Sequence, residues 1–130
     1  MDVPSATLAA MRKTNDLFCA TVVRLRDMSA LDKVYTPEAQ ILPPGAEMIH
    51  GLPGIKSFWL QAITGLDVKD ASLATVSAEM AGDTVVEIGR AALTLAGGQA
   101  VPVKYVVHWK RHDEDEEAWK WHIDIWNLNQ

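Results

Sequence analysis

Four β-rich runs fill the second half of this 130-residue chain, from Leu66 onward. Short junctions separate them: Gly-Asp at 82–83, Gly-Gly at 97–98 and the acidic run DEDEE at 113–117, which is typical of a solvated hairpin turn. Each junction is short enough to join antiparallel neighbours. This half of the sequence therefore predicts an antiparallel meander.

The first half of the chain has the periodicity of helices. After Pro4 and Ser5, apolar residues recur in steps of three and four as far as Leu25. A short second helix is expected at 29–35 and a third at 51–65, with an extended stretch around the Pro-Pro-Gly turn between them. Helices followed by a meander predict an α+β fold, in a single domain that covers residues 1–130.

The composition excludes several classes of protein. A formal net charge of −5 with scattered Lys and Arg argues against a nucleic-acid partner. No run approaches the ~18 apolar residues that cross a bilayer, and the N-terminus lacks the pattern of a signal peptide, so we expect a cytoplasmic protein without a membrane partner. The single Cys19 excludes an internal disulfide, and no Cys/His spacing resembles a zinc site.

The stretch WKWHIDIWN (119–127) predicts a last strand whose side chains alternate between two faces. One face is apolar and would hold Trp119, Trp121, Ile123 and Ile125. The other mixes charge with an indole and would hold Lys120, His122, Asp124 and Trp126. Such a mixed face suits either solvent or a ligand cavity.

Four stretches together carry a family resemblance. They are YTPEAQILPPG, HGLPGIKSFW, VKYVVHWKR and WKWHIDIWN. They resemble the nuclear transport factor 2-like superfamily, and within it the small bacterial SnoaL-like and ketosteroid-isomerase-like proteins. The resemblance covers nearly the whole chain. It implies a cone-shaped, curved antiparallel sheet packed against three N-terminal helices, with a ligand-sized cavity.

The resemblance does not extend to the residues of steroid isomerisation. Ketosteroid isomerases need a carboxylate base and an oxyanion hole made by Tyr and a protonated Asp. Here Pro43 stands where the base is expected, Phe18 or Cys19 falls near the place of the Tyr, and VKYVVHW offers no carboxylate. We therefore expect no steroid isomerisation by that mechanism.

The resemblance also implies which residues enter the cavity. Relatives such as scytalone dehydratases and polyketide cyclases use His and Asp groups inside the cone, and their last strand sends alternate residues inward. This implies that His122 and Asp124 form a catalytic acid–base pair. On the penultimate strand, a one-residue shift would exchange the two faces and bring His108 beside His122. The more apolar face favours Tyr105 inside, and the expected ligand-binding residues are then Trp59, Tyr105, Val107, Trp109 and Trp126.

Two classes of function follow. The first is an enzyme of the lyase, cyclase or isomerase kind that uses His122 and Asp124 for proton transfer on a small hydrophobic or aromatic ligand. The alternative is a non-catalytic module that binds a ligand or mediates assembly, in which case the pair could lie on a solvated or subunit-facing surface. No cofactor motif or nucleophile elbow is present, so we expect no cofactor.

Two further expectations concern metal and assembly. His122, Asp124 and His108 would together make a set of two histidines and one carboxylate, but strand neighbours alone do not establish a metal triad, so we predict no metal. If the even residues of the last strand face inward, Trp121, Ile123 and Ile125 make an outward apolar patch. Such a patch predicts a homodimer packed through the outer face of the sheet.

Overall fold

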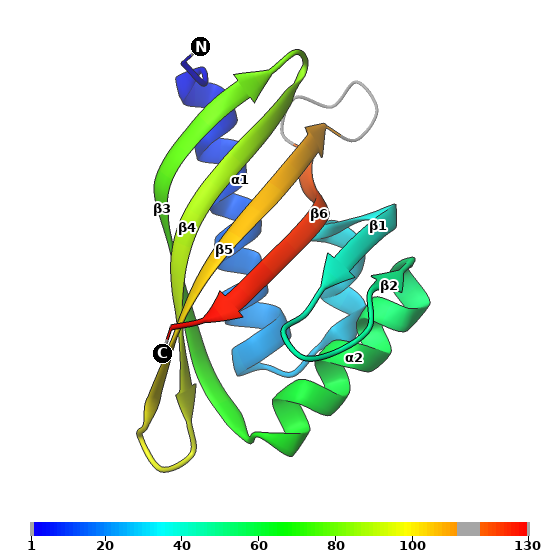
Figure 1. The fold of residues 1–130 in the computed structure, drawn as a ribbon, viewed down its shortest axis with the longest axis vertical. Helices are drawn as coiled ribbons and strands as arrows, with labels where there is room; N and C mark the ends of the chain where they lie inside the picture. The colour runs from blue at the N-terminus through cyan, green and yellow to red at the C-terminus, as the bar shows by residue number, and fades with distance from the viewer. Residues whose placement is uncertain (1, 112–117, 130) are drawn as a thin grey trace.

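The computed structural model describes residues 2–111 and 118–129, so the acidic run at 113–117 lies outside the described residues. The helical segments are α1 (Ser5–Leu17), the π-helical η1 (Phe18–Arg24), the 3-10 helix η2 (Met28–Lys33) and α2 (Leu52–Gly65) (Figure 1). The strands are β1 (Tyr35–Leu42), β2 (Ile49–His50), β3 (Val68–Ala81), β4 (Thr84–Leu95), β5 (Ala100–Arg111) and β6 (Trp119–Leu128). The predicted α+β class and the four late strands are confirmed.

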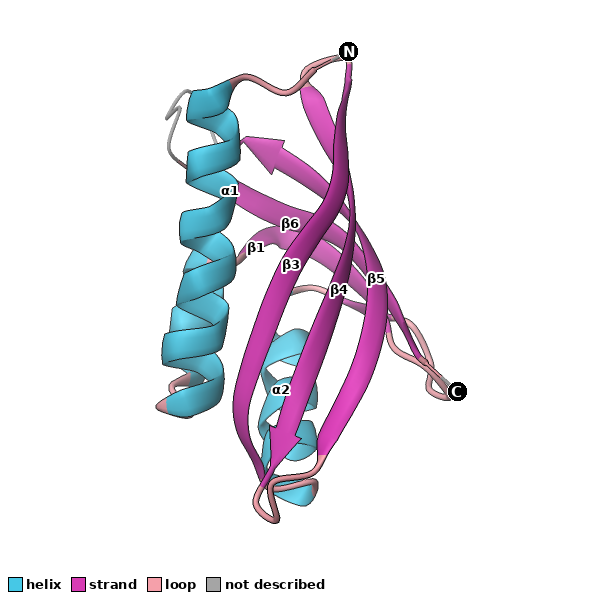
Figure 2. Ribbon diagram, turned by 90° about the vertical axis from the view of Figure 1, so that its left-hand side faces the viewer, coloured by secondary structure: helices cyan, strands magenta, loops and turns pink. Residues whose placement is uncertain are grey.

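The sheet is curved, and the helices lie on one side of it (Figure 2). Its strand order is β2-β1-β6-β5-β4-β3. The sheet is mixed rather than wholly antiparallel, because β1 pairs in parallel with β6 while all other neighbours are antiparallel. Within the described residues, no helix is long and apolar enough to cross a bilayer.

The short second helix differs from its predicted bounds. It is a 3-10 helix over Met28–Lys33, capped by the Asp27 carboxylate, which accepts a hydrogen bond from the Ser29 backbone N–H at 3.0 Å. Tyr35 was predicted as its last residue but begins β1, where it pairs with Trp121 of β6. A fully buried Tyr needs a partner for its hydroxyl, and from β1 the Tyr35 hydroxyl reaches the carboxyl group of Asp124.

A β-bulge at His122 changes which face of β6 is buried. On the neighbouring strand, Trp109 pairs with Trp121 and His108 pairs with Ile123, so one step along β5 spans two residues of β6. The extra residue reverses the alternation from that point. The inward side chains of β6 are therefore Trp119, Trp121, Asp124 and Trp126, and the outward ones are Lys120, His122, Ile123 and Ile125.

This bulge corrects the strict alternation predicted for the last strand. Trp121, expected on the outer patch, is buried and donates a hydrogen bond from Nε1 to Asn15 Oδ1 of α1 at 3.1 Å. His122, expected beside Asp124 in the cavity, lies on the opposite face of the sheet. The physical reason is that one inserted residue exchanges the faces of everything that follows it.

Gly89 of β4 gives the ring of Tyr105 room to lie flat against the sheet. The two residues are paired across β4 and β5. A Cβ added at Gly89 would lie 2.1 Å from Cζ of the Tyr105 ring. Because real Cβ atoms do not approach so closely, any side chain here must displace the ring.

We predict that Gly89→Ala destabilises the fold by about 1–3 kcal/mol, because the ring of Tyr105 must leave its place. The free energy of unfolding in urea measures the loss. Gly97→Ala is the matched control, since a Cβ there meets no atom within 4 Å. Equal stability of the two variants would contradict the packing described for Tyr105.

Candidate functional site

Asp124 is a buried carboxyl group held by a relay of hydrogen bonds. Tyr35 Oη donates to Asp124 Oδ2 at 2.6 Å, and Trp59 Nε1 of α2 donates to Tyr35 Oη at 3.1 Å. No fully buried side-chain oxygen or nitrogen of the described residues lacks a partner. Asp124 Oδ1 has none among these residues, so it borders open space. One oxygen of the carboxyl is therefore anchored and the other is available.

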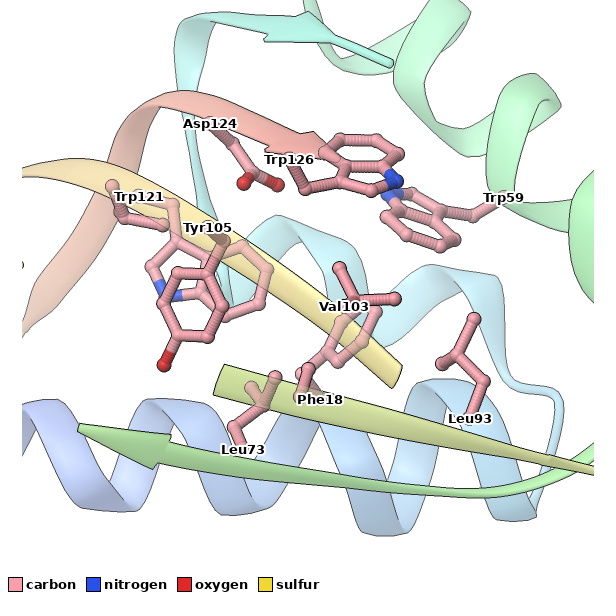
Figure 3. Close-up of a pocket in the computed structure, with 11 residues that line it drawn as sticks. Phe18, Trp59, Leu73, Leu93, Val103, Tyr105, Trp121, Asp124 and Trp126 are labelled. Carbon is pink, nitrogen blue, oxygen red and sulfur yellow. The ribbon is translucent and has the colours of Figure 1, made fainter. Parts of the chain in front are cut away.

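That available oxygen faces a cavity of about 50 Å³, named here the Asp124 cavity. Eleven of the described residues line it: five are aromatic, five are aliphatic, and Asp124 is the charged one among them. In Figure 3 the carboxyl group points into the space between Tyr105 and Trp126. The aromatic members are Phe18, Trp59, Tyr105, Trp121 and Trp126.

Burial sets the acidity of Asp124. Removal from water raises the pKa of its carboxyl group from 3.8 to about 7; the hydrogen bond from Tyr35 opposes this rise and the charge of Glu87 adds to it. Burial, followed by the neighbouring Asp124 charge, also raises the pKa of Tyr35 well above its usual value. Tyr35 therefore keeps its proton and acts as the donor, while Asp124 exchanges its own proton near neutrality.

Glu87 is a second buried carboxyl group, and the sequence analysis missed it. It is fully buried on β4 and accepts hydrogen bonds from Thr75 Oγ1 at 2.6 Å, Tyr105 Oη at 2.8 Å and Trp109 Nε1 at 2.9 Å. The sequence held one indication of this burial. Residues two apart on a strand share a face, and Glu87 lies two residues from Val85 and two from Gly89.

The two carboxyl groups lie in one row across the sheet. Glu87 of β4 pairs with Val107 of β5, which in turn pairs with Asp124 of β6. Neighbouring strands are about 4.8 Å apart, so the two acidic residues are separated by roughly 10 Å between Cα atoms. Their proximity explains why the charge of Glu87 contributes to the raised pKa of Asp124.

The structure brings most of the predicted site residues together. Asp124, Trp59, Tyr105, Val107 and Trp126 line the cavity. Trp109 was also expected there and is not among the lining residues. It is fully buried farther along β5, where it packs against Trp121 and donates to Glu87.

His122 lies outside the cavity, in a polar group on the outer face of the sheet. Its Nδ1 is 2.8 Å from Thr36 Oγ1, and its ring centroid is 6.2 Å from that of His108. Burial, followed by the charge of Lys110, lowers the pKa of His122 below its usual value. His108 and His122 therefore do meet, but on the face away from Asp124. Among the described residues, no group of three or more His, Cys, Asp or Glu side chains is arranged to hold a metal ion.

A model of the SnoaL-like domain matches residues 17–120, which is most of the chain. The chain belongs to the SnoaL-like family. This confirms the resemblance inferred from the sequence motifs. No protein of curated function matches the sequence significantly.

Solved structures place this SnoaL-like protein among nuclear transport factor 2-like folds. A domain with a cystatin-like fold from Nostoc punctiforme PCC 73102 has a TM-score of 0.81 at 12% identity, over 98% of this chain and 80% of its own. LinA has a TM-score of 0.71 at 17% identity, over 96% of this chain and 87% of its own. An NTF2-like protein from Silicibacter pomeroyi DSS-3 has a TM-score of 0.69 at 14% identity, over 98% and 100%. At these identities the likeness shows the fold alone.

We predict that Asp124→Asn removes a pH-dependent loss of stability. A carboxyl group whose folded pKa is raised stabilises the fold only while protonated, so its contribution is complete below pH 3.8 and is lost as the pH rises through about 7. The free energy of unfolding of the wild type should therefore fall relative to Asp124→Asn between pH 4 and pH 8, by on the order of 4 kcal/mol.

Denaturant unfolding across that pH range provides the measurement. Asp83→Asn, in the exposed turn between β3 and β4, is the matched control and should follow the wild type. A constant difference between the wild type and Asp124→Asn at every pH would show that Asp124 titrates as a solvated carboxyl.

Proposed function

We propose that this SnoaL-like protein binds a small, mostly apolar molecule in the Asp124 cavity and that Asp124 exchanges a proton with it. The observation that carries the proposal is a single ionisable carboxyl oxygen facing an otherwise apolar cavity. Cavities of this composition favour apolar ligands, and the few polar groups in them decide orientation. A carboxyl group that titrates near neutral pH is suited to general acid–base catalysis.

The role proposed for Asp124 differs from the acid–base pair expected from the sequence. His122 is on the other face of the sheet, so Tyr35 replaces it as the group that orients the carboxyl. As a base, Asp124 takes a proton from a C–H or O–H bond of the ligand through its available oxygen and can return it at another atom. These two steps are those of an isomerase, and loss of a leaving group after the first step is the course of a lyase or dehydratase.

Other polar groups of the cavity are already engaged. Tyr105 Oη donates to Glu87, Trp59 Nε1 to Tyr35 and Trp121 Nε1 to Asn15. Trp126 Nε1 has no acceptor among the described residues, and it is the one lining indole available to donate to a ligand oxygen. Its neighbour Trp59 stacks on it with ring centroids 5.2 Å apart.

Non-catalytic binding is the alternative function, and the size of the cavity limits the ligand in either case. One water occupies roughly 10–15 Å³ on this scale, so about 50 Å³ accepts a ligand of only a few non-hydrogen atoms. Catalysis is supported by LinA, a hexachlorocyclohexane dehydrochlorinase with a similar fold. The fold is therefore compatible with catalysis on a small apolar molecule. The two functions differ in whether a bound ligand loses a proton.

We predict that the protein accelerates exchange of the methyl hydrogens of acetone for deuterium in D₂O, measured by NMR. Acetone is small enough for the cavity, and its C–H bonds are acidified by the carbonyl group. The rate should rise with pH through about 7, as Asp124 ionises. It should fall by at least about 100-fold in Asp124→Asn, the usual contribution of a general base.

Asp83→Asn is again the control and should exchange at the wild-type rate. Binding of acetone without accelerated exchange would support the non-catalytic alternative. Exchange that is unchanged in Asp124→Asn would exclude Asp124 as the base.

We also propose that the protein is a homodimer packed through the outer face of the sheet. An apolar row crosses this face, because Ile88 pairs with Val106 and Val106 pairs with Ile125. Their exposed fractions are 49%, 39% and 37%. This row replaces the patch expected from the sequence, of which Trp121 is buried on the inner face.

We predict that Val106→Lys yields a monomer, because the substitution places a charge at the centre of the apolar row. Sedimentation at micromolar concentration should give a dimer for the wild type. Leu25→Lys is the control, since Leu25 is 74% exposed at the end of η1 and away from this row. A monomeric wild type would contradict the proposed dimer.

A further inference from the structure

Within the part of the chain that the structure describes, the core holds two acidic side chains and no basic one. Among the described residues, the buried charged side chains are Glu87 and Asp124. Glu87 receives three hydrogen bonds from neutral donors, an arrangement that matches an acceptor-only carboxylate. Asp124 receives one, and its second oxygen faces the cavity. Burying an unpaired charge is unfavourable, so Asp124 either keeps its proton or, when ionised, pairs with a positive group.

Aromatic rings provide the other part of a cation site. Phe18, Trp59, Tyr105, Trp121 and Trp126 line the same cavity as Asp124. Their π-faces carry negative charge and attract alkylated ammonium groups within about 6 Å of a ring centroid. None of the described lining residues is Lys, Arg or His, so none of them competes for the carboxylate as a cation.

We propose that the ligand of the Asp124 cavity carries a small alkylated ammonium group, which lies between the aromatic rings and pairs with the Asp124 carboxylate. This inference rests on the proposed function, since it specifies the class of ligand that the same cavity takes. The size agrees: about 50 Å³ corresponds to roughly three to five water-sized groups, and a tri- or tetramethylated nitrogen has four or five non-hydrogen atoms. If the nitrogen carries a proton, Asp124 and the ammonium group can exchange it within the cavity.

Binding of a cation at this place must compete with the proton of Asp124. The titratable groups around Asp124 are Tyr35 of β1, Tyr105 of β5 and Glu87 of β4, with Cys19 of η1 near Tyr105. Burial raises the pKa of both tyrosines and of Cys19, so these three stay protonated near neutral pH. Asp124, with a pKa of about 7, is the group whose ionisation controls cation affinity.

The test compares tetramethylammonium chloride with tert-butanol, a neutral molecule of the same number of non-hydrogen atoms. Binding is followed through the NMR signals of the indole N–H groups of Trp59 and Trp126. We expect tetramethylammonium to bind at least tenfold more tightly than tert-butanol at pH 8. Its affinity should fall about tenfold between pH 8 and pH 6, because the ionised fraction of a group with a pKa of about 7 falls by that factor.

Variants separate this inference from the proposed function. Asp124→Asn keeps the shape of the side chain and should abolish the preference for the cation, whereas Asp83→Asn should retain it. The pH dependence in the wild type tests the same point without any variant. Tighter or equal binding of tert-butanol in the wild type, or a preference for the cation that survives in Asp124→Asn, would overturn the inference. Acetone exchange that depends on Asp124 would still stand in that case, and cation binding without such exchange would refute proton transfer alone.

Discussion

The site depends on one inserted residue in the last strand. Up to Trp121, β6 presents indoles to the helices; after the bulge at His122, it presents Asp124 and Trp126 in the same direction. Without the bulge, Asp124 would face the outer side and Ile123 would fill the cavity wall. The bulge therefore places a carboxyl group, rather than an aliphatic side chain, beneath α2 and beside Tyr35.

Buried polar groups connect the helices to the sheet through hydrogen bonds. Asn15 of α1 holds Trp121, Trp59 of α2 holds Tyr35, and the row from Glu87 to Asp124 crosses three strands. In a core of low polarity such bonds are stronger than in water, and an unpaired group is correspondingly unfavourable. The hydrogen bonds thus fix the aromatic rings around the cavity, and they leave Asp124 Oδ1 available to bind a ligand.

The two faces of the sheet carry different chemistry. The inner face holds the cavity and both buried carboxyl groups, while the outer face holds the apolar row centred on Val106 and the polar contact between His108 and His122. Because the faces are separated by the thickness of one sheet, His122 cannot act on a ligand beside Asp124. The two residues expected to form a pair therefore belong to two different surfaces.

The sequence alone determined the order and type of the elements, since periodicity, Pro and Gly act locally. Through the family resemblance, the sequence also predicted that Trp59, Tyr105 and Trp126 line a cavity, and all three lie around the Asp124 cavity in the structure. Only the tertiary structure decided that the hydrogen-bond partner of Asp124 is Tyr35 and not His122. Strand alternation assumes an unbroken register, and a bulge forms where neighbouring strands must be accommodated, not where one residue type demands it. The burial of Glu87 likewise follows from donors on β3 and β5, which no local pattern brings together.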